Sequence, residues 1–310
     1  MAAVEQEPAR TAEQIRAIPL RHWGRWVGAA VVLLLVAWLI QSALKANVID
    51  FKEVRRYQFN RLILTGLKNT LIISVAAQAI GIVLGVAFAV GRLAKNPVLS
   101  VVSSFYIWFF RGTPVLVQLL FWFNAVPAVF RTLTIAIPFT GITLYSTRMV
   151  DFMTPFMAAF LGLGLNEGAY MAEIVRAGIL SVDEGQVEAA HAIGMTSSLT
   201  MRRIVLPQAM RVIIPPTGNE FISMLKTSSL ASVILYGEML RNAEDIISRN
   251  LEVFELLIVV SIWYLLVTTV ASVGQYYIER RYARGSARAQ ALTPLQRIRL
   301  NLLPRRHEWS

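Results

Sequence analysis

The chain has 310 residues, of which 55% are hydrophobic and only 16% charged, and its mean hydropathy is +0.54. This composition excludes an ordinary soluble protein, because the apolar residues come in blocks about twenty residues long, which is the spacing of a bilayer. The net charge of +11 arises from basic residues gathered between and beyond these blocks, which indicates anionic lipid and membrane topology rather than nucleic acid. The lack of cysteine excludes disulfides, thiol nucleophiles and thiolate metal sites.

Taken in chain order, the apolar blocks predict an all-α membrane protein with about six transmembrane helices. Gly81 and Gly85 form a Gly-x-x-x-Gly pair that either permits close helix contact or arises by chance in a Gly-rich helix. Proline and glycine interrupt the third span at Arg111-Gly112-Thr113-Pro114. The expected spans cover residues 27–44, 69–91, 98–126, 152 to the polar loop at 181, 212–236 and 256–278.

The polar intervals predict the remaining organisation. Residues 1–26 are expected to be a cytoplasmic tail, and 27–65 a transmembrane helix followed by a basic interfacial segment. Residues 282–310 are expected to form a basic cytoplasmic tail. Within the long connection at 127–151, partial alternation of polar and apolar residues predicts an extended segment or a hairpin.

The distribution of basic residues predicts how the spans are oriented in the membrane. With six alternating spans, the turn at Arg92 and Lys95, the loop at 181–211 and the arginine-rich tail fall on one side of the membrane. By the positive-inside rule this side is the cytoplasm, and both termini are expected there. The basic segment at 45–68 then falls outside, against the rule.

The loop at 181–211 is expected to contain two helices separated by a break. Ser181 and Glu184 have the spacing of a capping box, so the first helix is predicted to begin there. Gly194 is expected to end it, Thr196 or Ser197 to cap the second helix, and Pro207 to disturb that second helix. A thin, capped helix of this kind is suited to a groove of a partner protein.

The order Glu-Ala-Ala, Gly, then Ile-x-Leu-Pro in this loop resembles the signature loop of the membrane subunits of bacterial ABC importers. Gly185-Gln186, Pro207-Gln208-Ala209, the stretch 218–223 (GNEFIS) and Arg111-Gly112-Thr113-Pro114 are similar to the polar amino-acid permease branch. So are 226–230 (KTSSL) and 166–176 (NEGAYMAEIVR). The resemblance covers roughly residues 66–281.

The resemblance implies a five-helix type I ABC importer core plus one N-terminal helix, in the bacterial cytoplasmic membrane. It implies a permease that moves polar amino acids, driven by a separate ABC ATPase dimer and served by an extracytoplasmic amino-acid-binding protein. A second permease, identical or a sister chain, and membrane lipid are the other expected partners; no nucleic acid and no cofactor are expected. The residues implied to couple to the ATPase are Gly185, Glu188, Ala189, Ala190, Gly194, Ile204, Leu206 and Pro207.

Charges at membrane depth predict a substrate pathway, because a charge at mid-membrane costs about 2.5–3.5 kcal/mol on insertion scales. An amino-acid zwitterion needs partners for its carboxylate and its ammonium when it is desolvated. Cationic side chains can meet the carboxylate and acidic ones the ammonium, although the same charges could instead pair with each other and lock the helices. The expected pathway residues are Arg111, Thr113, Gln118, Glu167, Tyr170, Glu173, Asn219, Glu220 and Lys226.

Enzyme chemistry is not expected. Ser223 and Lys226 satisfy Ser-x-x-Lys, but no Lys-Thr-Gly or Ser-Asp-Asn accompanies them. The three histidines lie far apart and offer no metal spacing, so neither a catalytic nor a metal site is predicted. The alternatives left open are an ABC permease for an opine or an osmolyte, and a secondary transporter.

Overall fold

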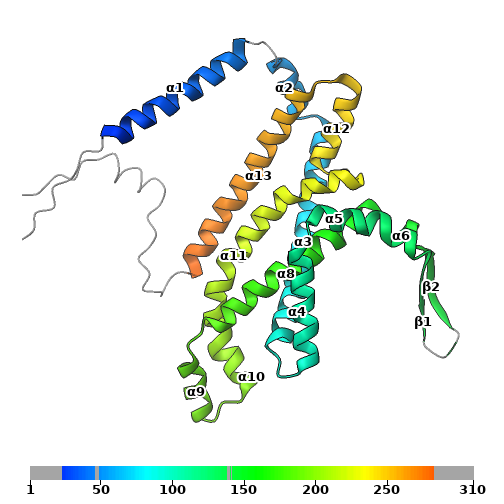
Figure 1. Cartoon of the computed structure of the whole chain (residues 1–310), viewed down its shortest axis with the longest axis vertical. Coiled ribbons are helices and arrows are strands. Elements are labelled where there is room, and N and C mark those ends of the chain that lie inside the picture. Colours follow the sequence, from blue (N-terminus) through cyan, green and yellow to red (C-terminus); the bar gives the residue numbers. More distant parts are fainter. Residues whose placement is uncertain (1–22, 46–48, 138–139, 141, 283–310) are drawn as a thin grey trace, which may run out of the picture. The chain divides into compact units, whose positions relative to one another are not determined.

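The computed structural model describes residues 23–45, 49–137, 140 and 142–282 (Figure 1). The chain separates into two units, residues 1–50 and residues 51–310. Most of the expected N-terminal tail, and the basic tail after residue 282, lie outside the described residues.

The described part of the first unit contains one helix, α1 (Trp23–Lys45), where the first span was predicted. Apolar side chains occupy all of its sides, so it has no polar face. Its strongly apolar part, Trp26–Leu39, is shorter than the roughly 20 residues that cross a bilayer.

Among its described residues, the second unit is a set of helices with one small hairpin. Two of these helices, α3 (Arg61–Leu93) and α13 (Val253–Tyr282), are long and apolar enough to cross a membrane. The bent pair of α4 (Pro97–Gly112) and α5–α6 (Val115–Val129) provides a third candidate. The helices α8 and α11 fall short of the same criterion because polar residues interrupt them. The elements are α2 (Phe51–Gln58), α3 (Arg61–Leu93), α4 (Pro97–Gly112), α5 (Val115–Leu120), the π-helical turn η1 (Phe121–Ala125), α6 (Val126–Val129), β1 (Thr132–Ala136), β2 (Thr143–Arg148), α7 (Met149–Phe152), α8 (Pro155–Leu180), α9 (Glu184–Ala192), α10 (Ser197–Thr200), the π-helical turn η2 (Met201–Val205), α11 (Leu206–Thr227), the 3₁₀ helix η3 (Ser228–Ile234), α12 (Met239–Asn250) and α13 (Val253–Tyr282).

The longest contact in the second unit is between α3 and α8, and glycines make it possible. A Cβ atom built on Gly81 would lie 2.9 Å from Glu167 Cβ, and one built on Gly85 would lie 2.9 Å from the carbonyl carbon of Met171. Both distances are shorter than side chains tolerate. Of the two interpretations of the Gly-x-x-x-Gly pair, the structure therefore supports close helix contact.

The third span is broken as predicted. Helix α4 ends at Gly112, α5 begins at Val115, and the chain bends by 103° between them. Thr113 and Pro114 between the two helices are extended, because the proline disfavours a helical conformation in the residue before it.

The predicted fifth span is wrong at both ends. Helix α11 begins at Leu206 rather than 212 and ends at Thr227, after which the chain tightens into η3. The hydroxyl groups of Ser228 and Ser229 donate to the carbonyl oxygens of Leu225 and Lys226, at 2.9 and 2.7 Å. Such local bonds compete with the α-helical ladder.

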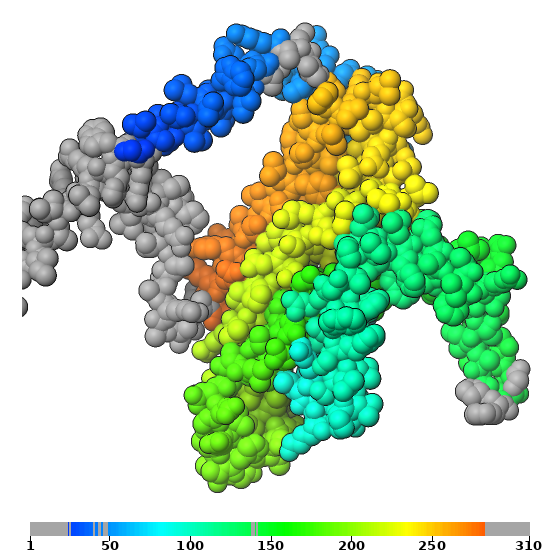
Figure 2. Space-filling model, viewed as in Figure 1, coloured from blue at the N-terminus to red at the C-terminus, as the bar shows by residue number. Residues whose placement is uncertain are grey.

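The connection at 127–151 contains the predicted hairpin, which extends away from the helices of the second unit (Figure 2). Strands β1 and β2 are antiparallel, with Leu133 opposite Thr147 and Ile135 opposite Tyr145. Because side chains alternate along a strand, these four residues share one face, and the other face carries the pairs Thr132–Arg148 and Thr134–Ser146.

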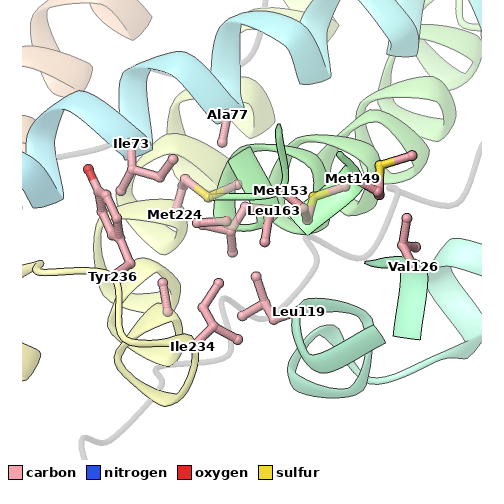
Figure 3. Packing of buried hydrophobic residues seen from close by; sticks show 13 residues of the cluster. Ile73, Ala77, Leu119, Val126, Met149, Met153, Leu163, Met224, Ile234 and Tyr236 are labelled. Carbon is pink, nitrogen blue, oxygen red and sulfur yellow. The ribbon is translucent and has the colours of Figure 1, made fainter. Parts of the chain in front are cut away.

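The main hydrophobic core lies where α3, α5, α8, α11 and η3 meet (Figure 3). Ile73, Leu119, Leu163, Met224 and Ile234 are all buried there. The core therefore joins five helical elements, of which only α11 and η3 are consecutive along the chain.

We expect Gly85→Ala to destabilise the protein by about 1–3 kcal/mol, because the added methyl group would meet the backbone of Met171. The matched control is Gly274→Ala in α13, where an added Cβ would meet nothing within 4 Å. The control is expected to be neutral or to stabilise by about 0.5–1 kcal/mol, since alanine favours a helix over glycine. Thermal unfolding of the two purified variants measures the difference. Equal melting temperatures would contradict the tight α3–α8 contact.

Candidate functional site

A polar cavity of about 550 Å³ lies between the α4–α5 break, α8 and α11. Its wall contains one arginine, two glutamates and several hydroxyl and amide groups, which is unusual for the interior of an apolar helical protein. The lining residues are Arg111, Gly112, Thr113, Pro114, Val115, Leu163, Asn166, Glu167, Tyr170, Glu220, Ser223, Met224 and Thr227. Five of the nine predicted pathway residues are among them.

The break between α4 and α5 forms one wall, and two amide side chains hold it. Gln118 Nε2 donates to the carbonyl oxygens of Phe110 and Thr113, at 3.0 and 3.1 Å, and to Thr113 Oγ1 at 2.8 Å. Asn166 Nδ2 donates to the same Phe110 carbonyl at 2.8 Å. These bonds satisfy carbonyl groups that the broken helix leaves without partners. Gln118, predicted to line the pathway, instead stabilises the bend behind it.

The two cavity glutamates come from α8 and α11. Glu167 is 4% exposed, and its Oε1 accepts a hydrogen bond from Gln78 Nε2 of α3 at 3.1 Å. Glu220 is only partly buried. In the described part of the chain, neither carboxylate has a salt-bridge partner within 4.0 Å. Both are therefore able to interact with a cationic group in the cavity.

Arg111 is the cation of the cavity wall. Its guanidinium carbon lies 5.1 Å from the ring centroid of Tyr170, which also lines the cavity, so the two make a cation–π contact. Its Nη1 also lies 3.7 Å from Glu173 Oε1. Arg111 thus connects the cavity to a second group of charges.

That second group of charges is centred on Glu173, which lies one helical turn after Tyr170 on α8. Its carboxylate accepts hydrogen bonds from Arg92 of α3 and from Arg176 Nε, the latter at 3.0 Å. With Arg111 nearby, one carboxylate faces three guanidinium groups. Glu173 therefore joins α3, α4 and α8, and it does not line the cavity.

The last two predicted pathway residues are also outside the cavity lining. Asn219 and Lys226 are both exposed on α11. Lys226 lies three residues beyond Ser223, which does line the cavity. The sequence alone placed all of these residues at membrane depth without showing which side of each helix faces which neighbour.

Sequence reasoning missed several contributors to the site. Gln78 is the only amide side chain in the predicted second span after Asn69, and that isolation is a signal that could have identified it. Asn166 was noted only as part of a motif, and Ser223 and Thr227 follow Glu220 at helical spacing. Gln78 gives Glu167 its one hydrogen-bond partner among the described residues.

The second candidate site is the coupling segment, residues 181–211, at the end of the second unit that carries α9 and α10 (Figure 1). The predicted helix start at Ser181 is wrong. The Ser181 hydroxyl donates to the Gly178 carbonyl at 2.7 Å and ends α8, whereas the Asp183 carboxylate caps α9 by accepting from Gly185 N at 2.9 Å. Asp183 is the better cap here because Ser181 still belongs to the last turn of α8.

The end of α9 and the start of α10 are as predicted. Gly194 has a φ of +85°, the left-handed conformation that favours glycine after a helix. Thr196 caps α10 through its hydroxyl. The π-helical turn η2 ends at Val205, two residues before Pro207 in the first turn of α11, so the predicted disturbance near this proline is confirmed.

The predicted coupling residues differ in their solvent exposure. Ala190 is 4% exposed because it packs within the segment itself, whereas Gly185, Glu188, Ala189, Gly194, Leu206 and Pro207 are exposed and Ile204 is intermediate. The sequence-based prediction did not include Ile193, whose side chain is 80% exposed at the end of α9. An apolar side chain so exposed at a projecting tip is a candidate contact for another protein.

Comparisons with known proteins agree on one family. Residues 81–284 match the family described as "Binding-protein-dependent transport system inner membrane component". The chain is 45% identical to the arginine transport system permease protein ArgU of Corynebacterium glutamicum, covering 93% of this chain and 90% of that protein. It is 35% identical to the glutamine transport system permease protein GlnP of Escherichia coli (strain K12), covering 71% of this chain and 92% of that protein.

Solved structures show the same likeness. The chain is similar to a chain of "an amino acid ABC transporter with histidines", with 36% identity, a TM-score of 0.64 and coverage of 75% of this chain and 99% of that one. A methionine ABC transporter, MetNI, in an inward-facing conformation has the same fold at 17% identity and a TM-score of 0.56. The expected type I ABC importer permease fold is therefore confirmed.

We expect Glu173→Gln to lower the free energy of unfolding by about 1.5–3 kcal/mol, because hydrogen bonds to a charged group contribute that much and three arginines would lose their shared carboxylate. Glu244→Gln is the matched control: its ion pair with Arg241, at 3.9 Å on the surface of α12, should contribute less than about 1 kcal/mol. Thermal unfolding in one detergent compares the two. A Glu173→Gln melting temperature equal to that of the control would show that this cluster does not hold the helices.

Proposed function

Because the chain belongs to the inner membrane components of binding-protein-dependent transport systems, we propose that it is the permease subunit of an ABC importer and that its polar cavity passes amino acids, basic ones in particular. The observation that supports this most directly is the charge of the cavity wall. One guanidinium, from Arg111, lies in the same wall as two carboxylates, from Glu167 and Glu220.

The charge balance favours a basic solute. An amino acid leaving water must keep partners for its carboxylate and its ammonium. Arg111 can bind the carboxylate and one glutamate the ammonium, which leaves the other glutamate for a cationic side chain. Arg111 also shares its charge with Glu173, so the cavity as a whole is more acidic than basic. The name of the C. glutamicum relative, an arginine permease, agrees with this proposal.

The proposed partners follow from the two ends of the second unit. The coupling segment, with its exposed Ile193, docks on a separate ATPase subunit that supplies the energy. This end lies in the cytoplasm, because Arg92, Lys95, Arg202 and Arg203 gather there. The opposite end, with α2 and α12, faces the binding protein, and a second permease completes the pathway.

We expect Glu220→Gln to raise the apparent KM for arginine uptake about tenfold and that for glutamine less than about threefold, because losing a charge-assisted contact costs about 1.5–3 kcal/mol. Uptake of both labelled amino acids is measured in cells that express the chain with the subunits it assembles with, using one binding protein throughout. Asp151→Asn, which removes an exposed carboxylate that pairs with Arg148 and does not line the cavity, is the control and should change neither value. Unchanged arginine uptake, or an equal loss for both amino acids, would contradict a cavity that recognises side-chain charge.

We expect Ile193→Asp to abolish transport and substrate-stimulated ATP hydrolysis while the permease still inserts and unfolds at the same temperature, because the side chain contacts little of its own chain. Ile193→Leu keeps the apolar contact and should retain most activity. Ala190→Arg is less informative, since Ala190 is buried within the segment and the variant would disturb its fold. Full coupling in Ile193→Asp would remove this residue from the proposed docking surface.

A further inference from the structure

A second cavity, about 360 Å³ in volume, lies between α3, α11 and α13. It is separated from the polar cavity by the Gln78–Glu167 hydrogen bond, because Gln78 lines one cavity and Glu167 the other. Its character is the opposite of the first: the wall is almost entirely hydrocarbon. The lining includes Ile82, Ile214, Phe221, Ala271, Gly274 and Ile278.

Most of the few polar groups of this apolar slot have hydrogen-bond partners, and the exception is Gln78 Oε1, which is buried without a partner among the described residues. Gln275 Nε2 donates to the Pro215 carbonyl oxygen at 3.0 Å and to Glu279 Oε1 at 2.9 Å. Gln78 donates to Glu167. Gly274 contributes no side chain, and a Cβ built on it would meet nothing within 4 Å. The slot is therefore open along α13 and suited to a hydrocarbon chain rather than to a polar solute.

One end of the slot is marked by arginines. Helices α11 and α13 lie side by side and run in opposite directions (Figure 1). Arg211 lies three residues before Ile214, and Arg281 lies three residues after Ile278, so each is one helical turn beyond a lining residue and on the same face. Because the helices are antiparallel, both arginines come at the same end of the slot.

These arginines have no acidic partner within 4.0 Å among the described residues, and both are exposed. Arg280 adds a third positive charge beside Arg281, against the single carboxylate of Glu279, which accepts from Gln275. An apolar slot can hold the acyl chain of a phospholipid, and two unpaired guanidinium groups at its end can bind the phosphate. Guanidinium groups bind phosphate oxygens in a bidentate geometry.

We propose that this slot binds one acyl chain of an anionic phospholipid, whose phosphate lies between Arg211 and Arg281. An anionic headgroup is favoured over a zwitterionic one because each basic residue near a membrane surface is worth about 1 kcal/mol, or about fivefold in affinity, toward anionic lipid. The bound chain packs against Gln78, behind Glu167 of the polar cavity. The lipid thus supports the wall of the transport path.

The test is lipid retention by the full-length chain, purified with the subunits it assembles with and examined by native mass spectrometry. Phosphatidylglycerol and phosphatidylcholine with the same acyl chains are added in equal amounts. We expect phosphatidylglycerol to be retained in preference to phosphatidylcholine. Gly274→Leu fills the open part of the slot and should remove that preference. Arg211→Gln with Arg281→Gln should weaken phosphatidylglycerol binding about 25-fold, at about fivefold for each arginine.

Two controls keep the result specific. Arg249→Gln removes an exposed arginine from α12, at the other end of the second unit, and should retain phosphatidylglycerol as the unsubstituted chain does. Gly274→Ala adds only one methyl group and should retain most of it. Melting temperatures of all variants are compared, so that a folding defect is recognised; if Gly274→Leu is unstable, the arginine double variant decides the question.

Three results would overturn the proposal. The first is undiminished phosphatidylglycerol binding in Gly274→Leu and in the arginine double variant. The second is equal retention of the two lipids by the unsubstituted chain. The third is a change in subunit number in Gly274→Leu, which would show that a second permease chain covers the slot.

Discussion

The close approach of α3 and α8 is the constraint on which the rest of the second unit depends. Gly81 and Gly85 remove the side chains that would keep the two backbones apart. The same approach brings Gln78 to Glu167 near the middle of the pair and Arg92 to Glu173 further along it. The cavity wall and the charge cluster are therefore two consequences of one contact, since neither pair would meet if the helices were separated by an ordinary layer of side chains.

Within this frame, amide side chains make the breaks of the other helices tolerable. Hydrocarbon offers no hydrogen bonds, so each carbonyl group released by a proline or a bend needs a partner from the protein. Gln118 and Asn166 supply such donors at the α4–α5 break. In α11, Gln275 Nε2 donates to the Pro215 carbonyl oxygen. The break and the proline segment border the polar cavity and the apolar slot respectively. The polar cavity thus lies at a broken helix whose carbonyl groups are hydrogen-bonded by amide side chains, and the apolar slot lies beside the proline segment of α11.

Local features of the fold were predictable, because each depends on residues within one or two turns of the chain. The break at Pro114, the left-handed Gly194 and the threonine cap of α10 all follow from intrinsic backbone preferences. The hairpin followed from alternation in the 132–144 stretch. Local preference failed where two residues of similar chemistry competed: Ser181 and Asp183 can both cap a helix, and the length of α8 decided that Asp183 does so.

The sequence by itself determined that this chain is a membrane protein of an ABC importer family and where most of its long apolar helices lie, and it located charged residues within or beside them. Only the tertiary structure decided what each charge does. Glu167 and Glu173 are six residues apart on one helix, yet the first borders a cavity and the second binds arginines. The reason is that the role of a buried charged side chain depends on the groups it contacts, and these groups come from other helices. Gln78 reaches Glu167 across 89 residues of chain, a distance over which local sequence carries no information.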